Sequence, residues 1–477
     1  MDMQINGSIR DESLDRFRRR TILGVLCFLF VAVPVLNVLG VVDNTHVNKL
    51  GRYLCFAIVA LGIDLLWGYT GLLGLCQAFF FCLGGYAMAM HLSLPEGGGN
   101  VRPEYHNIPQ FFFFNNVDIL PNWWAPFASL PCTLIAALAI PTFLSLVLGF
   151  TVFRSRVRGV YFAIITQAVA WGAFLLFCRN EMLLGGTNGL TNFDPALNRN
   201  QGWVLCLYLL TVAVLTGLFL VARWITKSRL GRLLVAVRDK EMLLNFLAYR
   251  PESMKLFAFV AAALFAAVGG MLYVPQNGII TPNIMRVEDS IWMIIWVALG
   301  GRGYLWGAAV GALVVNYGYS VMTSDMPRAW PFFEGGMFLA VVMLFPSGLV
   351  GLWEQFERDI HAGARLRWVL AGLLLGLLGL IAYRSGWLWW LPGYGLWVLG
   401  GIVVVLILSA RSLVTAAVSS VAFFFVSEAL GLVPESLQAL WFGLPAKYCV
   451  LFAVLGGAAL VARLRLAPGY VRRIQWA

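Results

Sequence analysis

The feature that most constrains this chain is its succession of apolar runs, each about 17 to 25 residues long. An α-helix of about 20 apolar residues crosses the hydrocarbon core of a bilayer, and a soluble core does not need such runs in series. Of the 477 residues, 60% are hydrophobic and 12% are charged, whereas soluble proteins are about 45–50% apolar and about 25% charged. The sequence therefore predicts an all-α, polytopic membrane bundle of about 14 helices.

The runs fall into two groups separated by a polar stretch. The first group is expected at 21–41, 51–68, 71–92, 124–152, 160–178, 203–222, 256–274, 288–300, 305–322 and 331–346, and the second at 366–384, 387–409, 412–431 and 447–463. The predicted organisation is an N-terminal segment at 1–20, a ten-span core at 21–353, a linker at 354–367, additional helices at 368–463 and a tail at 464–477.

The basic residues are distributed unevenly among the connecting segments, and this sets the expected orientation. The net charge is +11, and with the N-terminus inside, 25 of the 34 Lys and Arg lie in cytoplasmic segments. Such an excess is the usual pattern of helical membrane proteins. We therefore expect both termini, the linker and the tail to be cytoplasmic. Because no basic patch lies on a soluble domain, nucleic-acid binding is not expected.

One cytoplasmic segment, 226–255, has the pattern of an amphipathic helix. Apolar residues recur at helical spacing over 230–249, and Arg232, Arg238, Asp239 and Glu241 occupy much of the other face. Such a helix either lies flat on the lipid headgroups or docks onto a soluble partner, and the pattern alone does not separate the two.

Several polar side chains lie inside predicted spans, where they are costly and therefore informative. Asp64 is the clearest case, and Gln77, Gln167 and Asn316 are neutral counterparts. The ordinary role of such groups is a hydrogen bond between helices. The alternative is that they line a pathway through the membrane.

Motifs for energy conversion and metal chemistry are absent from the sequence. There is no GxxxxGK[ST] phosphate loop and no HExxH, and none of the eight cysteines forms a CxxC pair. We therefore expect no metal site, no catalytic residue and no cofactor bound by this chain.

Several longer stretches resemble permeases of the branched-chain amino-acid/urea class of ATP-binding-cassette (ABC) importers. Those of the whole class are 61–73 (LGIDLLWGYTGLL), 79–88 (FFFCLGGYAM), 154–162 (RSRVRGVYF) and 345–351 (FPSGLVG). The urea-type branch is favoured by 180–190 (NEMLLGGTNGL), 274–282 (VPQNGIITP) and 296–303 (WVALGGRG). The resemblance covers about residues 20–353 and leaves the four C-terminal spans unexplained.

The resemblance implies a transport subunit of a bacterial inner membrane, not an enzyme. Its implied partners are a second homologous permease in a heterodimer, two cytoplasmic ATPases that use the ATP, and an extracytoplasmic solute-binding protein. It also implies that residues from Gly231 to Glu241 couple to an ATPase. The chain departs from the family pattern in two places, since Cys76 and Gln77 replace a Gly-His pair and Ala248 replaces a glycine.

The substrate expected from this resemblance is urea or a short amide. Urea has four N–H donors and one carbonyl acceptor, so a pathway for it needs acceptors and at least one donor in an apolar wall. Asp64, Thr70, Gln77 and Gln167 supply that mixture. An amino acid would instead need a cationic group or helix N-termini along the route. A third alternative is an ion-coupled carrier or intramembrane enzyme built on the C-terminal spans.

Overall fold

The computed structural model describes residues 28–38, 43–97, 101–102, 108–109, 112, 120–155, 159–191 and 201–325, and the single positions 335, 348 and 350. The chain divides into two compact units, 1–349 and 350–477. The predictions for 1–20, the linker, the additional helices and the tail lie outside the described residues, as does almost all of the span at 331–346. The predicted domain limits stay predictions.

The described chain is predominantly helical, which confirms the predicted fold class. The main helices are α3 (Asn44–Ile63), α4 (Gln77–Ser93), α6 (Leu130–Arg154), α7 (Val160–Phe177), α9 (Gln201–Lys227), α10 (Arg229–Phe246), α11 (Pro251–Asn277), α12 (Val287–Gly300) and α13 (Leu305–Asp325). A π-helix, η2 (Asp64–Tyr69), continues α3. The shorter elements are η1 (Phe28–Ala32), α2 (Val33–Val38), η3 (Pro95–Gly97), η5 (Ala125–Ala128), η6 (Asn180–Met182), η7 (Gly186–Asn188), η8 (Pro282–Met285) and the antiparallel strands β1 (Val101–Arg102) and β2 (Ile108–Pro109).

Within the described residues, five helices are long and apolar enough to cross a membrane. Helices α12 and α13 together form a sixth candidate, but the chain bends by 120° at the break between them. The outward faces of α6 and α7 expose large apolar side chains such as Phe143, Phe150 and Ile164. That pattern is typical of helices that face lipid, so the membrane-bundle prediction is confirmed, although the count of 14 is not tested.

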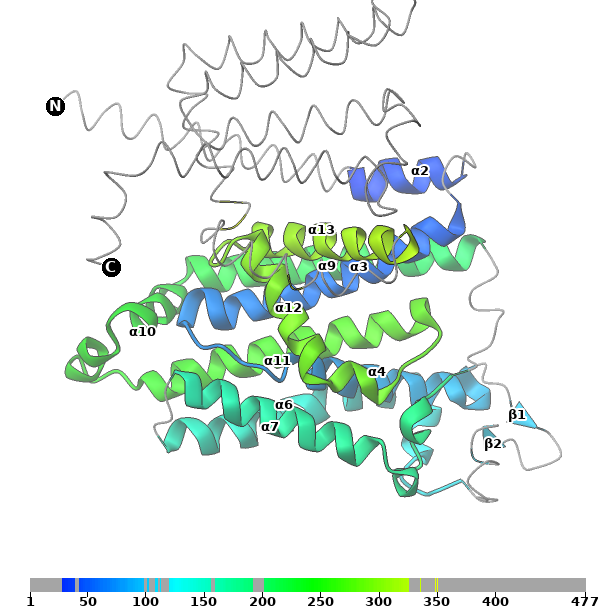
Figure 1. Cartoon of the computed structure of the whole chain (residues 1–477), viewed down its shortest axis with the longest axis horizontal. Coiled ribbons are helices and arrows are strands. Elements are labelled where there is room, and N and C mark those ends of the chain that lie inside the picture. Colours follow the sequence, from blue (N-terminus) through cyan, green and yellow to red (C-terminus); the bar gives the residue numbers. More distant parts are fainter. Residues whose placement is uncertain are drawn as a thin grey trace, which may run out of the picture. The chain divides into compact units, whose positions relative to one another are not determined.

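Helix α11 packs against α3, α4 and α6, and α3 also packs against α9 and α13 (Figure 1). The contact between α11 and α4 is close because both faces carry glycine. A β-carbon at Gly84 would meet the backbone oxygen of Ala267, and one at Gly270 would meet that of Phe81. Small residues that let backbones approach are the usual means by which membrane helices associate.

Several predicted boundaries are wrong, and the helix of the span expected at 51–68, for example, begins at Asn44. The span expected at 71–92 begins as a helix only at Gln77, because residues 71–76 follow an irregular path that starts with Gly71 at a φ of +76°. The span expected at 124–152 begins with the short helix η5, and the α-helix itself starts at Leu130. The amphipathic helix expected at 230–249 ends at Phe246 and is kinked at Lys240, where φ is −148° and ψ is 62°.

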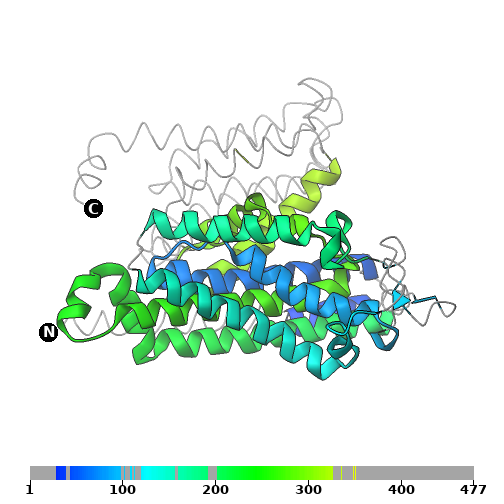
Figure 2. The ribbon, with the colours of Figure 1, turned by 90° about the horizontal axis from the view of Figure 1, so that it is seen from below.

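The bundle has two distinguishable ends. Helix α10 projects at one end, which we call the α10 end, and β1 and β2 lie at the other, which we call the far end (Figures 1 and 2). Helix α3 runs toward the α10 end, where η2 contacts α10, and α11 runs back from it. Since the turn between α12 and α13 also reaches η2, α12 begins away from the α10 end and α13 ends away from it.

Candidate functional site

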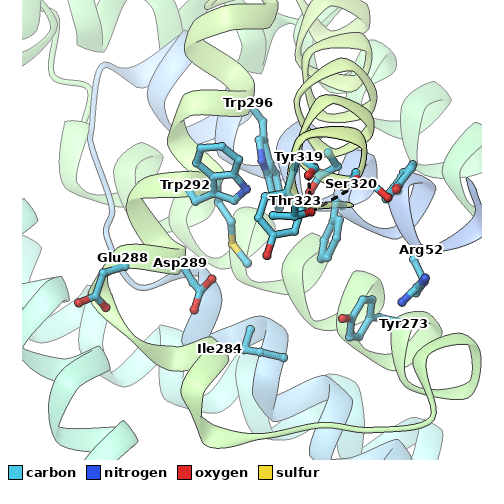
Figure 3. Close-up of a pocket in the computed structure, with 14 residues that line it drawn as sticks. Arg52, Tyr273, Ile284, Glu288, Asp289, Trp292, Trp296, Tyr319, Ser320 and Thr323 are labelled. Atoms are coloured by element: carbon cyan, nitrogen blue, oxygen red, sulfur yellow. Dashed lines mark hydrogen bonds between the residues drawn. The ribbon is translucent and has the colours of Figure 1, made fainter. Parts of the chain in front are cut away.

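A cavity of about 500 Å³ lies between α3, α11, α12 and α13, away from the α10 end (Figure 3). Its size is within the range of about 300–1,000 Å³ that is usual for small-molecule sites. Aromatic rings form much of the wall and hydroxyl and amide groups a smaller part. The lining residues are Arg52, Tyr53, Phe56, Tyr273, Ile284, Glu288, Asp289, Trp292, Met293, Trp296, Asn316, Tyr319, Ser320 and Thr323.

Opposite charges stand on different elements of this cavity. Arg52 comes from the first half of α3, whereas Glu288 and Asp289 occupy the first turn of α12 (Figure 3). The Nη1 atom of Arg52 donates a hydrogen bond of 2.8 Å to Oδ1 of Asn277, which fixes the guanidinium at the end of α11. The aromatic side chains of Tyr273 and Trp292 also line the space. The cavity therefore has a cationic side, an anionic side and an apolar wall.

Two donors at this cavity are buried without a hydrogen-bond partner among the described residues. They are Nε of Arg52 and Nε1 of Trp296, whose side chain is 2% exposed. A buried donor that stays unpaired costs about 1–3 kcal/mol, so such groups call for an explanation. Both are N–H donors, which suits an acceptor such as a carboxylate or carbonyl oxygen.

At the α10 end, Asp64 is fully buried and holds the turn between α12 and α13. Its Oδ1 accepts a 2.7 Å hydrogen bond from the backbone N–H of Gly303. Arg302 reinforces the same junction, because its Nε donates to the backbone oxygen of Trp67 at 3.2 Å and its guanidinium lies 4.9 Å from the centre of the Trp67 ring. Two residues of η2, Asp64 and Trp67, are thus hydrogen-bonded to the break between α12 and α13.

Helix α10 meets the same junction from the other side. Nη1 of Arg238 donates a 2.7 Å hydrogen bond to the backbone oxygen of Gly68, and its Nε pairs with Oδ1 of Asp239 at 2.9 Å. The hydrogen bond from Arg238 lowers the pKa of the exposed Asp239 carboxyl, so that Asp239 is ionised at neutral pH. Arg238 is therefore the side chain that connects α10 to the end of η2, through its hydrogen bond to Gly68.

The other coupling residues predicted from the sequence all lie on α10 or just after it. Glu241 forms an ion pair with Lys255 of α11, with 2.7 Å between Oε1 and Nζ. Gly231 is buried, and a β-carbon at this position would meet the backbone of Thr226. Arg232 is exposed, and Ala248 follows the helix at a φ of +60°. Whether these residues contact an ATPase stays a prediction.

The four predicted pathway residues do not all occupy one place. Asp64 and Thr70 lie at the two ends of η2, and the Thr70 hydroxyl is bonded to the backbone oxygen of Leu66. Gln77 begins α4, buried, with neither of its amide atoms paired. Gln167 lies half-buried on α7. None of the four lines the cavity of Figure 3, and their role in a pathway stays a prediction.

The cavity residues Arg52, Glu288 and Asp289 were missed from the sequence. They lie at the starts of two spans far apart in the chain, where charged residues are ordinary boundary markers. Asn316 was noticed as a polar group inside a span, with a hydrogen bond between helices as its ordinary role. The signal that could have found them is that the span expected at 51–68 begins with a cationic residue and the span expected at 288–300 begins with two anionic residues.

The comparison with protein families decides the class. Residues 46–342 match the family described as branched-chain amino acid transport system / permease component. The chain belongs to this family. It is therefore a permease component of an ABC importer, a multi-pass protein of the inner membrane, and such components work with an ATPase and a binding protein.

Individual relatives agree with this assignment. The chain is 25% identical to the high-affinity branched-chain amino acid transport system permease protein LivM of Escherichia coli K12, over 70% of this chain and 75% of that protein. It is 23% identical to the permease protein BraD of Pseudomonas aeruginosa, over 64% of this chain and 94% of that protein. The autoinducer 2 import permease LsrC of Yersinia pestis is 29% identical over 31% of this chain and 41% of that protein. No solved structure matches.

Proposed function

We propose that this permease carries a zwitterionic amino acid with an apolar side chain through the inner membrane. The observation that carries the proposal is the cavity with Arg52 on one side, Glu288 and Asp289 on another and aromatic rings between (Figure 3). Support also comes from the relatives, since LivM and BraD are named for branched-chain amino acids.

The chemistry of the cavity matches each part of such a substrate. An α-carboxylate would accept hydrogen bonds from the Arg52 guanidinium, which suits planar, two-point recognition of carboxylates. The α-ammonium would lie toward the carboxylates of Glu288 and Asp289. The apolar side chain would pack against Trp292 and Tyr273, with the unpaired N–H of Trp296 as a further donor.

The proposed orientation places the α10 end in the cytoplasm and the cavity toward the extracytoplasmic side, with both termini cytoplasmic. A binding protein would deliver the amino acid to the far end of the bundle. ATP would be used by two separate ATPases that dock on α10, and a second, homologous permease would complete the heterodimer. This chain would bind no cofactor of its own.

Urea is the second candidate, favoured by the unpaired amide of Gln77 inside the bundle. Urea is neutral, so it gains little from a guanidinium placed opposite two carboxylates. The two candidates therefore differ in their dependence on Arg52.

The test is uptake of labelled leucine and labelled urea into vesicles that hold the complete importer. Arg52→Gln should lower leucine uptake at least about tenfold, because a charge-assisted hydrogen bond is lost. Arg286→Gln is the matched control, since Arg286 lies exposed beside the ring of Phe174 and does not line the cavity. Urea uptake by the wild-type importer without leucine uptake would overturn the proposal in favour of urea.

A further inference from the structure

The α10 end holds a series of hydrogen bonds and packing contacts that leads from α10 toward the helices that wall the cavity. We infer that Arg238 is the positioning residue that couples α10 to the substrate cavity, through η2 and the turn between α12 and α13. The inference rests on the proposed function only in that the protein works with separate ATPases. It holds for any transported solute.

The first step runs from α10 to η2. Arg238 donates to the backbone oxygen of Gly68 at 2.7 Å, and its side-chain carbons lie so close to Gly71 that a β-carbon there would be 2.9 Å from Cγ. Gly71 has a φ of +76°, a conformation that glycine adopts without strain. The end of η2 is therefore shaped to receive this one side chain.

The second step runs from η2 to the break between α12 and α13. Asp64 opens η2 and accepts the N–H of Gly303, and a β-carbon at Gly68 would meet both Oδ1 of Asp64 and the Gly303 nitrogen, 2.7 Å away. Gly68, whose carbonyl oxygen accepts the hydrogen bond from Arg238, is thus packed directly against the hydrogen bond between Asp64 and Gly303. A displacement of Gly68 cannot leave that bond unchanged.

The third step runs along α12 and α13 to the cavity. Helix α12 has 14 residues, which corresponds to about 21 Å at the rise of an α-helix. It carries Trp292 and Trp296 in the cavity wall, and α13 contributes Asn316. The break beside Gly303 is the natural pivot for the two helices, because α12 ends at Gly300, α13 starts only at Leu305, and Gly303 between them has a φ of +83°.

The structure thus offers a mechanical reason for a cationic side chain at position 238. When an ATPase moves α10, Arg238 pulls on Gly68, and the Asp64–Gly303 bond passes the movement to the pivot of the two cavity helices. Arg223 lies near the end of α9, outside the segment 226–255, and no side-chain bond of it is seen among the described residues. It provides a control of equal charge.

The experiment compares Arg238→Ala with Arg223→Ala in the purified importer with its ATPases and loaded binding protein. The readouts are the stimulation of ATP hydrolysis by the loaded binding protein, solute uptake, and the amount of assembled complex. Arg238→Ala should lower stimulation and uptake about tenfold or more per assembled complex. Arg223→Ala should leave all three readouts unchanged.

Three further variants test the series of contacts itself. Asp64→Asn keeps an oxygen that accepts the Gly303 N–H and should retain most of the stimulation, whereas Asp64→Leu should lose it. The double variant Arg238→Ala/Asp64→Leu should be no worse than the poorer single variant, because both break one path. The inference is overturned if Arg238→Ala keeps full stimulation, if activity falls only in proportion to assembly, or if the two losses multiply. None of these outcomes depends on which solute is carried.

Discussion

Ala248 holds a backbone conformation that is unfavourable for any residue with a β-carbon. Its φ is +60°, and it lies in the turn after α10, where the N–H of Tyr249 donates to the backbone oxygen of Leu244 at 3.0 Å. The left-handed conformation costs a non-glycine residue about 1–2 kcal/mol. Glycine, which has no β-carbon, would adopt this conformation without that cost.

Replacing this residue should relieve the strain. Ala248→Gly is expected to stabilise the protein by about 0.5–1 kcal/mol, the left-handed cost less the greater freedom of glycine in the unfolded chain. The midpoint of thermal unfolding of the purified importer measures it. The control is Ala236→Gly inside α10, which should destabilise by about 0.5–1 kcal/mol. A decrease in stability for Ala248→Gly would contradict the expectation.

Gln77 is expected to lower the stability of the folded protein for a different reason, because its amide is buried and unpaired. The side chain is 1% exposed, and within the part of the chain that the structure describes neither its oxygen nor its nitrogen has a partner. Gln77→Met keeps the approximate volume and removes the polar atoms, so it should stabilise the protein by about 1 kcal/mol. If Gln77 lines the pathway, as the sequence predicts, uptake should fall while stability rises. Unchanged uptake would remove Gln77 from the pathway.

The acidic residues in the first turn of α12 have two candidate roles, and mutation can separate them. Glu288 and Asp289 lie in the first turn, where carboxylates interact favourably with the helix dipole by about 0.3–1 kcal/mol. They also line the cavity. A role limited to the helix end would affect stability alone, whereas a role in binding an ammonium group would affect the concentration dependence of transport.

The expected result for Glu288→Gln/Asp289→Asn is a small loss of stability together with a large rise in the leucine concentration needed for half-maximal uptake. The rise should reach about tenfold, because the charge-assisted contact to the ammonium is gone. Urea uptake, if the importer shows any, should be unaffected. A change in stability with unchanged leucine dependence would assign the two acids to the helix end.

At the scale of the elements, sequence patterns predicted the long helices but missed the irregular segments. Apolar runs predicted α3, α6, α7, α9 and α11 because length and hydropathy are local properties of a chain. The irregular path at 71–76 was missed, since its residues continue an apolar run and hydropathy does not distinguish a helix from an irregular segment packed against protein. The kink at Lys240 was missed for a similar reason, because apolar spacing continues through it.

The cavity was missed because it depends on tertiary packing, not on any local pattern. Its walls come from positions between 52 and 323, and no single stretch contains both signs of charge and the aromatic rings. Asp64 was singled out correctly as an unusual buried group. Its bond to Gly303, however, follows from the sharp turn between α12 and α13, which no periodicity encodes.

At the scale of the whole molecule, the family match ends at residue 342, and residues 350–477 form a separate unit. Transport should therefore be a property of the first unit. A chain that ends after Arg358 is expected to transport at about the wild-type rate when the partners are present. Uptake assays matched for protein in the membrane measure this, and loss of uptake by a correctly inserted, truncated chain would make the C-terminal unit part of the pathway.

Helix α4 has a consequence for how this protein is made. It has 17 residues, almost all buried against other helices, and it is not among the described helices that are long and apolar enough to cross a membrane alone. Gln77 and His91 are tolerated there because protein, not lipid, surrounds them. The main helix that encloses α4 is α11, which begins 158 residues after α4 ends. We therefore expect stable insertion of α4 during synthesis to depend on its neighbours, and a weakened α11 to lower the yield of correctly inserted protein.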